Sequence, residues 1–210
     1  MFGIENFTGF IMAAILLNLT PGADTMYILT RSISQGRRAG LVSVAGIITG
    51  CVVHVFCAAF GLSLILTTSA GVFTVVKWAG AGYLVFLGIK ILFDRQNGFT
   101  PDSVQNKSKD LFKIYKQGIL TNVLNPKVAL FFLSFLPQFI NPSQVNGPLP
   151  FLILGATFLF TGTLWCLTLA WMAAAMTRTL RARPAIGIAL QKMSGLVFIG
   201  FGVKLALDKN

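Results

Sequence analysis

The apolar residues of this 210-residue chain fall into six long runs separated by shorter polar stretches. A run of about 20 apolar residues lets one helix cross the hydrocarbon core of a membrane. We therefore predict an all-α polytopic membrane protein with six transmembrane helices. The predicted spans are roughly Phe7–Thr30, Leu41–Leu66, Val72–Phe93, Gly118–Ile140, Leu149–Met176 and Ile186–Leu207.

One polar stretch, rich in Lys, Asp, Asn, Gln and Ser, divides these spans into two groups of three. We expect a first three-helix unit over residues 1–95, a cytoplasmic linker over 96–116 and a second three-helix unit over 117–210. The two units would form one membrane domain. The end of the polar stretch, "LFKIYKQG", fits either a short amphipathic helix on the membrane surface or a solvated segment.

Composition supports the membrane assignment, because charged residues make up only 11% of the chain, against about 25% in ordinary soluble domains. The net charge of +11 does not indicate nucleic-acid binding, because the basic residues lie in clusters between apolar runs. Most of them adjoin the first, third and fifth predicted loops, with Arg31, Arg37 and Arg38 in the first. Since basic loops stay in the cytoplasm, we predict both termini outside it.

Two pairs of short motifs recur in the two halves. "GIKILFDR" and "GVKLALDK" end the third and sixth spans, 114 residues apart. "NLTPG" and "NVLNPK" lie inside the first and fourth spans, where Pro21 and Pro126 are 105 residues apart. Because three spans is an odd number, the second half would be inserted upside down. We predict a 3+3 inverted repeat with proline-broken helices 1 and 4, a pattern that places transporter sites at the midplane.

Each predicted break frees backbone groups that can bind a substrate. Proline removes a helix donor, and freed carbonyls inside a membrane need protein or a watery cavity. The N-terminus of a half-helix attracts an anion, whereas the freed carbonyls and the Thr20 or Asn125 side chains can hold an ammonium. Asp24 follows one break and Lys127 the other, so we expect them to pair at the midplane. Simple proline kinks with structural charges stay an alternative.

These arguments give a set of candidate substrate- or ion-binding residues. They are Asn18, Thr20, Pro21, Gly22, Asp24, His54, Asn122, Asn125, Pro126 and Lys127. His54, the one histidine, would either relay protons or hydrogen-bond a neighbouring helix while neutral. We expect no catalytic residues, no metal site and no cofactor, and the three cysteines form no C-x-x-C pair.

The motifs together resemble the LysE/RhtB family of amino-acid exporters. The resemblance rests on "NLTPGADTMYILTRSISQGRRAGLVSVAGI", "WAGAGYLVFLGIKIL" and "NVLNPKVALFFLSFLPQF", and extends from about Phe7 to Leu207. It implies a protein of the bacterial inner membrane that exports threonine, homoserine or leucine by proton-coupled alternating access. The family often has Pro-Gly-Pro at the first break, and here Ala23 replaces the second proline, which makes the start of the resumed helix less rigid.

The expected partners are the lipid bilayer, an amino acid and H+, with a homodimer as an open alternative to a monomer. An exporter of metal or other small cations is the main competing hypothesis, although Asp24, His54, Cys51 and Cys57 are few donors for such a site. A thiol–disulfide carrier would need a cysteine near each break. An intramembrane enzyme is not indicated, since neither H-E-x-x-H nor G-x-S-x-G occurs. A purely structural subunit would leave the two breaks unexplained.

Overall fold

The computed structural model describes residues 3–62, 110–141, 144 and 147–182, with isolated positions between 71 and 93 and between 189 and 203. The regular structure of these residues is helical, apart from one isolated bridge between Ile4 and Ile140. The predicted all-α class is thus confirmed for the described part of the chain. The third and sixth predicted spans, Val72–Phe93 and Ile186–Leu207, lie outside the described residues except for isolated positions.

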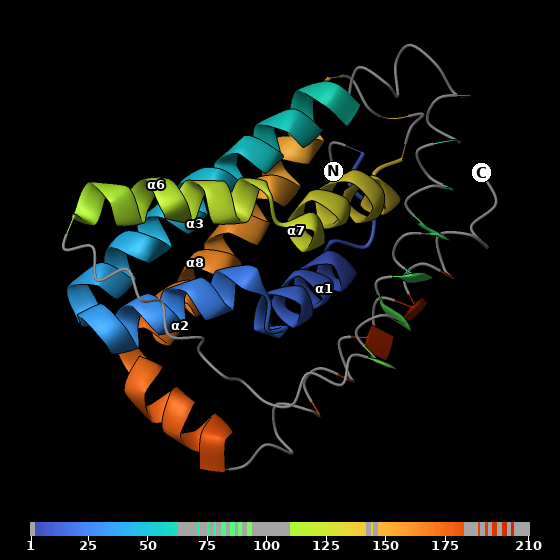
Figure 1. Cartoon of the computed structure of the whole chain (residues 1–210). Coiled ribbons are helices and arrows are strands. Elements are labelled where there is room, and N and C mark those ends of the chain that lie inside the picture. The colour runs from blue at the N-terminus through green and yellow to red at the C-terminus, as the bar shows by residue number, and fades with distance from the viewer. Residues whose placement is uncertain are drawn as a thin grey trace.

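Six α-helices are described, and Figure 1 shows how they lie. They are α1 (Phe7–Leu19), α2 (Ala23–Gln35), α3 (Arg37–Phe56), α6 (Leu111–Val123), α7 (Pro126–Leu130) and α8 (Leu149–Ala182). A π-helical turn, Cys57–Leu62, extends α3, while π-helical Phe131–Phe135 and 3-10 Leu136–Phe139 extend α7. By length and apolar composition, Arg37–Leu62 and Leu149–Ala173 can each cross a membrane, and the described residues contain up to four spans if each bent helix pair is one.

The two bent pairs are interrupted next to the prolines that the sequence singled out. Helix α1 ends at Leu19 and α2 begins at Ala23, with a bend of 49°. Helix α6 ends at Val123 and α7 begins at Pro126, with a bend of 45°. Pro126 lies in the first turn of α7, where a missing N–H leaves no hydrogen bond unmade. Both pairs therefore present helix ends in the interior of the molecule (Figure 1).

The structure changes two details of the expected organisation. Helix α6 begins at Leu111, so "LFKIYKQG" is helical and continuous with the rest of α6, and most of it lies in the stretch over 96–116 that we expected to be a linker. The Asp110 carboxylate caps this helix by accepting from the Phe112 N–H at 2.9 Å. The placement of Arg31, Arg37 and Arg38 in the first loop was wrong, because Gly36, with φ of 84°, alone separates α2 from α3. Arg31 lies within α2 and is 3% exposed, whereas Arg37 and Arg38 begin α3.

Helix α3 is the central packing element, in contact with α2, α6 and α8. Its approach to α6 is close, since a Cβ on Gly118 would lie 3.1 Å from the Cα of Gly46. Two buried apolar clusters result, one around Phe10 and Phe131 and the other around Ile28 and Leu169. The candidate site lies where these two clusters meet.

Candidate functional site

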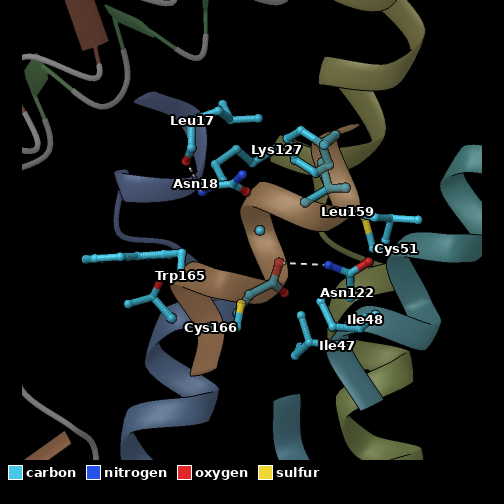
Figure 2. Close-up of a pocket in the computed structure, with 15 residues that line it drawn as sticks. Leu17, Asn18, Ile47, Ile48, Cys51, Asn122, Lys127, Leu159, Trp165 and Cys166 are labelled. Atoms are coloured by element: carbon cyan, nitrogen blue, oxygen red, sulfur yellow. Dashed lines mark hydrogen bonds between the residues drawn. The ribbon is translucent and has the colours of Figure 1, made fainter. Parts of the chain in front are cut away.

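A cavity of about 40 Å³ lies beside the two helix interruptions, with room for a few water molecules. All six described α-helices contribute to its wall, as Figure 2 shows in close-up. Four of the predicted site residues line it: Asn18, Asp24, Asn122 and Lys127. They come from α1, α2, α6 and α7, the four helices that flank the interruptions. The remainder of the wall is mostly apolar.

Asp24 is the acidic residue of the cavity wall and lies in the first turn of α2. The amide Nδ2 of Asn122 donates to its Oδ2 at 2.8 Å, and the helix N-terminus also favours a carboxylate there (Figure 2). Within the described residues, the buried Asp24 Oδ1 and Asn122 Oδ1 have no hydrogen-bond partner. Unsatisfied buried oxygens are costly. They are therefore available acceptors for a bound cation or N–H donor.

Lys127 reaches the cavity from the opposite broken pair. Its ammonium Nζ donates to the carbonyl oxygens of Thr20 at 2.9 Å and Leu17 at 3.2 Å. These carbonyls lie at the C-terminal end of α1, where the helix has partial negative charge. The expected Asp24–Lys127 ion pair does not occur among the described residues in this conformation. Lys127 instead joins its own half of the chain to the end of α1.

The other predicted residues of the two interruptions lie around the cavity without lining it. The Thr20 hydroxyl, at the C-terminal end of α1, donates to the Leu16 carbonyl at 2.8 Å. Asn125 caps α7 by accepting from the Lys127 backbone N–H at 3.1 Å. Gly22 lies beside the lysine side chain, because a Cβ there would be 3.2 Å from Nζ. Pro21 belongs to the non-helical segment between α1 and α2.

Asn18 and His54 join the broken helices to their neighbours. Asn18 Nδ2 donates to Thr161 Oγ1 on α8 at 3.1 Å. His54 Nε2 lies 3.0 Å from the Asn122 carbonyl oxygen, and its ring stacks on that of Phe132 with centroids 6.2 Å apart. A carbonyl oxygen only accepts, so Nε2 is the protonated nitrogen. Of the two roles expected for His54, the structure contains the hydrogen bond to a neighbouring helix.

Sequence reasoning missed part of the cavity wall. Cys51, Trp165 and Cys166 line it, although none of them is among the candidate site residues, and Gly162 completes the α8 face. The buried Trp165 Nε1 has no hydrogen-bond partner in the part of the chain that the structure describes. These α8 residues lie on one helical face, at intervals of three and four positions. Only knowledge of which face points inward would have identified them.

Comparison with known proteins gives matches over nearly the whole chain. Residues 15–209 match the family model described as LysE type translocator. An uncharacterized membrane protein, YrhP, of Bacillus subtilis is 31% identical over 98% of this chain and 100% of its own length. The leucine efflux protein of Enterobacter sp. is 31% identical over 98% of this chain and 97% of its own length. The leucine efflux protein of Klebsiella pneumoniae is 30% identical over 98% of this chain and 96% of its own length. No solved structure matches the chain significantly.

Proposed function

Since the chain belongs to the LysE family of translocators, we propose that it exports neutral amino acids of the threonine, homoserine or leucine type across the bacterial inner membrane. The observation behind this proposal is the cavity between two interrupted helices, which has a carboxylate from one and an ammonium from the other. The similarity to leucine efflux proteins over nearly the full length supports it. It is a transport function rather than an enzymatic one.

The cavity chemistry suits both ends of an amino acid. The substrate carboxylate would bind Lys127 and the N–H groups at the start of α2, where the helix dipole has its positive end and no side chain caps the helix. The substrate ammonium would bind Asp24 or the freed carbonyls of α1. Among the described lining residues Asp24 is the single acid. If Asp24 binds the substrate ammonium, the wall has no second carboxylate for a basic substrate side chain. The apolar wall, which includes Ile47 and Phe158, favours an uncharged side chain.

The mechanism that we propose is alternating access in a six-helix, 3+3 inverted repeat with both termini outside the cytoplasm. The interruptions before Ala23 and at Pro126 would occupy matching positions of the two halves, and bends of 49° and 45° support this correspondence. Proton binding to Asp24 would alternate with binding of the substrate ammonium. That exchange would couple export to the proton gradient, because one carboxylate serves both cations.

Export from cells tests this proposal directly. Cells that express the chain are preloaded with a panel of labelled amino acids, and loss of each label is compared with cells carrying an empty vector. We expect selective loss of threonine, homoserine or leucine. Retention of the whole panel, with the protein confirmed in the membrane, would contradict the proposal. Metals would be tested next, although the described residues contain no group of three or more His, Cys, Asp or Glu side chains suited to a metal ion.

Gly162 provides a test of where the substrate binds. A Cβ at this position would lie 3.2 Å from Asn18 Oδ1, inside the cavity wall. We expect Gly162→Val to raise the KM for leucine export roughly 10- to 200-fold, because its side chain takes space from the substrate and a size mismatch in an apolar pocket costs ~1–3 kcal/mol. Gly82→Val is the matched control, since a Cβ at Gly82 meets nothing within 4 Å. Equal KM values for the two variants would argue against binding in this cavity.

A further inference from the structure

The ammonium group of Lys127 binds to backbone carbonyls at the C-terminal end of α1. Lys127 Nζ donates to the Thr20 and Leu17 carbonyls at 2.9 and 3.2 Å. We infer that these two carbonyls are the subsite for the substrate's ammonium group, and that Lys127 occupies this subsite as a placeholder while no substrate is bound. The inference rests on the proposed export of amino acids. The two carbonyls would accept two of the three N–H donors of the ammonium, and Asp24, which lines the same cavity, would accept the third.

The geometry fits such an exchange because the two ligands are chemically alike. A lysine side chain and an amino acid each present an –NH3+ group with three N–H donors. Leu17 and Lys127 both line the cavity, so a substrate in it lies next to the Leu17 part of this subsite and next to the lysine. When the substrate ammonium takes the carbonyls, the released Lys127 ammonium can meet the substrate carboxylate. Lys127 would thus leave the subsite for the substrate ammonium and then bind the substrate carboxylate.

The other broken helix has a matching arrangement. The offset of 105 residues that relates Pro21 to Pro126 also relates Leu17 to Asn122. The Asn122 carbonyl, near the end of α6, is bonded by His54 Nε2 at 3.0 Å, and His54 comes from the first half of the chain. The Leu17 carbonyl is bonded by Lys127 from the second half. A side-chain nitrogen from the opposite half therefore bonds a carbonyl near the end of each broken helix, which supports a site for an N–H donor at these carbonyls.

The space for the lysine ammonium depends on Gly22. A Cβ at this position would lie 3.2 Å from Nζ and 3.5 Å from Cε of Lys127, closer than most side-chain contacts. The glycine thus leaves room for an ammonium against the α1 carbonyls. Removal of the lysine side chain would leave these carbonyls open to a small cation of the same chemistry. Methylammonium, which has an –NH3+ group and one methyl, is a suitable probe.

The test is a thermal unfolding measurement on the purified full-length protein in detergent. Midpoints are compared in methylammonium chloride and in tetramethylammonium chloride at equal ionic strength, because tetramethylammonium has no N–H to donate. For Lys127→Ala we expect methylammonium to raise the midpoint by about 3 to 6 °C at ten times its dissociation constant. Wild type should give the same midpoint in both salts, since its own ammonium fills the subsite. Lys116→Ala, a lysine over the Phe112 ring at 4.4 Å and away from the cavity wall, is the control and should behave as wild type.

Equal midpoints of Lys127→Ala in the two salts would overturn the inference, and so would the same rise in wild type. If Lys127→Ala does not fold, Lys127→Leu provides the second variant, because leucine keeps an apolar stem, has no ammonium and is too short to reach the carbonyls. It should give a methylammonium-specific rise as well, and no rise would overturn the inference. Export by wild-type cells is scored separately. Export without the methylammonium effect removes only the placeholder role of Lys127, whereas the effect without export leaves the cation subsite and removes amino-acid export.

Discussion

Replacement of Asp24 with asparagine is expected to lower export at subsaturating substrate by roughly 10- to 150-fold. The carboxylate lies in the cavity wall and keeps one oxygen without a partner among the described residues, ready to accept from a cation. Loss of a hydrogen bond to a charged group costs about 1.5–3 kcal/mol, which corresponds to that range. Asparagine keeps the size of the side chain and its position in the first turn of α2. Initial rates of label efflux from preloaded cells measure the effect, normalised to the protein in the membrane.

Asp110→Asn is the matched control for this experiment. Asp110 caps α6 outside the cavity, accepting from the Phe112 N–H at 2.9 Å, and asparagine caps a helix about as well as aspartate. The control should therefore export at the wild-type rate. If Asp24→Asn also kept full export driven by a pH gradient, Asp24 would be a structural residue, and coupling through it would have to be abandoned. A loss of export in both variants would point to folding rather than to the site.

The two interruptions lie beside residues whose effect on a helix is local. A proline lacks a backbone donor wherever it stands, so Pro21 and Pro126 led us to predict a break in the first and fourth spans. In the structure α1 ends at Leu19 and α6 ends at Val123. Polar residues next to the prolines likewise marked Asn18 and Asn122, which line the cavity. Both inferences needed only neighbours in the chain.

The partners of the charged side chains were beyond the sequence, because they lie far away along the chain. Lys127 bonds carbonyls more than 100 positions away rather than Asp24. Arg31 bonds Gln117 Oε1 at 2.6 Å, 86 positions away, and stacks over the ring of Tyr27. Whether Lys127 bonds the Asp24 carboxylate or the two α1 carbonyls depends on the angle between α1 and α2. The composition of the chain does not determine that angle.

The cavity wall on α8 was hidden for a different reason. A soluble helix has one apolar stripe that marks its buried face. A membrane helix is apolar on the lipid side as well, so Phe158 and Trp165 in the wall resemble Phe160 and Trp171, which are exposed. The sequence therefore identifies the helix without giving its rotation. Only packing against α1, α2 and α3 fixes which residues face inward.

Packing also gives the second large expected effect, the loss of stability in Gly46→Val. A Cβ at Gly46 would overlap the Tyr115 carbonyl oxygen and lie 3.0 Å from the Cα of Gly118, so neither helix backbone can give way cheaply. We expect valine to lower the free energy of unfolding by ~1–3 kcal/mol. The thermal midpoint in detergent should fall by about 2–12 °C, measured beside Gly61→Val, where a Cβ meets nothing within 4 Å.

The same substitution should reduce export by more than the loss of folded protein. The α3–α6 contact holds the end of α6 in place, and Asn122 at that end donates to Asp24 at 2.8 Å. Displacement of α6 by the valine side chain would draw this amide away from the carboxylate and change the cavity. Export per folded molecule should therefore fall in Gly46→Val and stay unchanged in Gly61→Val. Wild-type melting together with wild-type export in Gly46→Val would mean that the two helices do not pack this closely in the membrane.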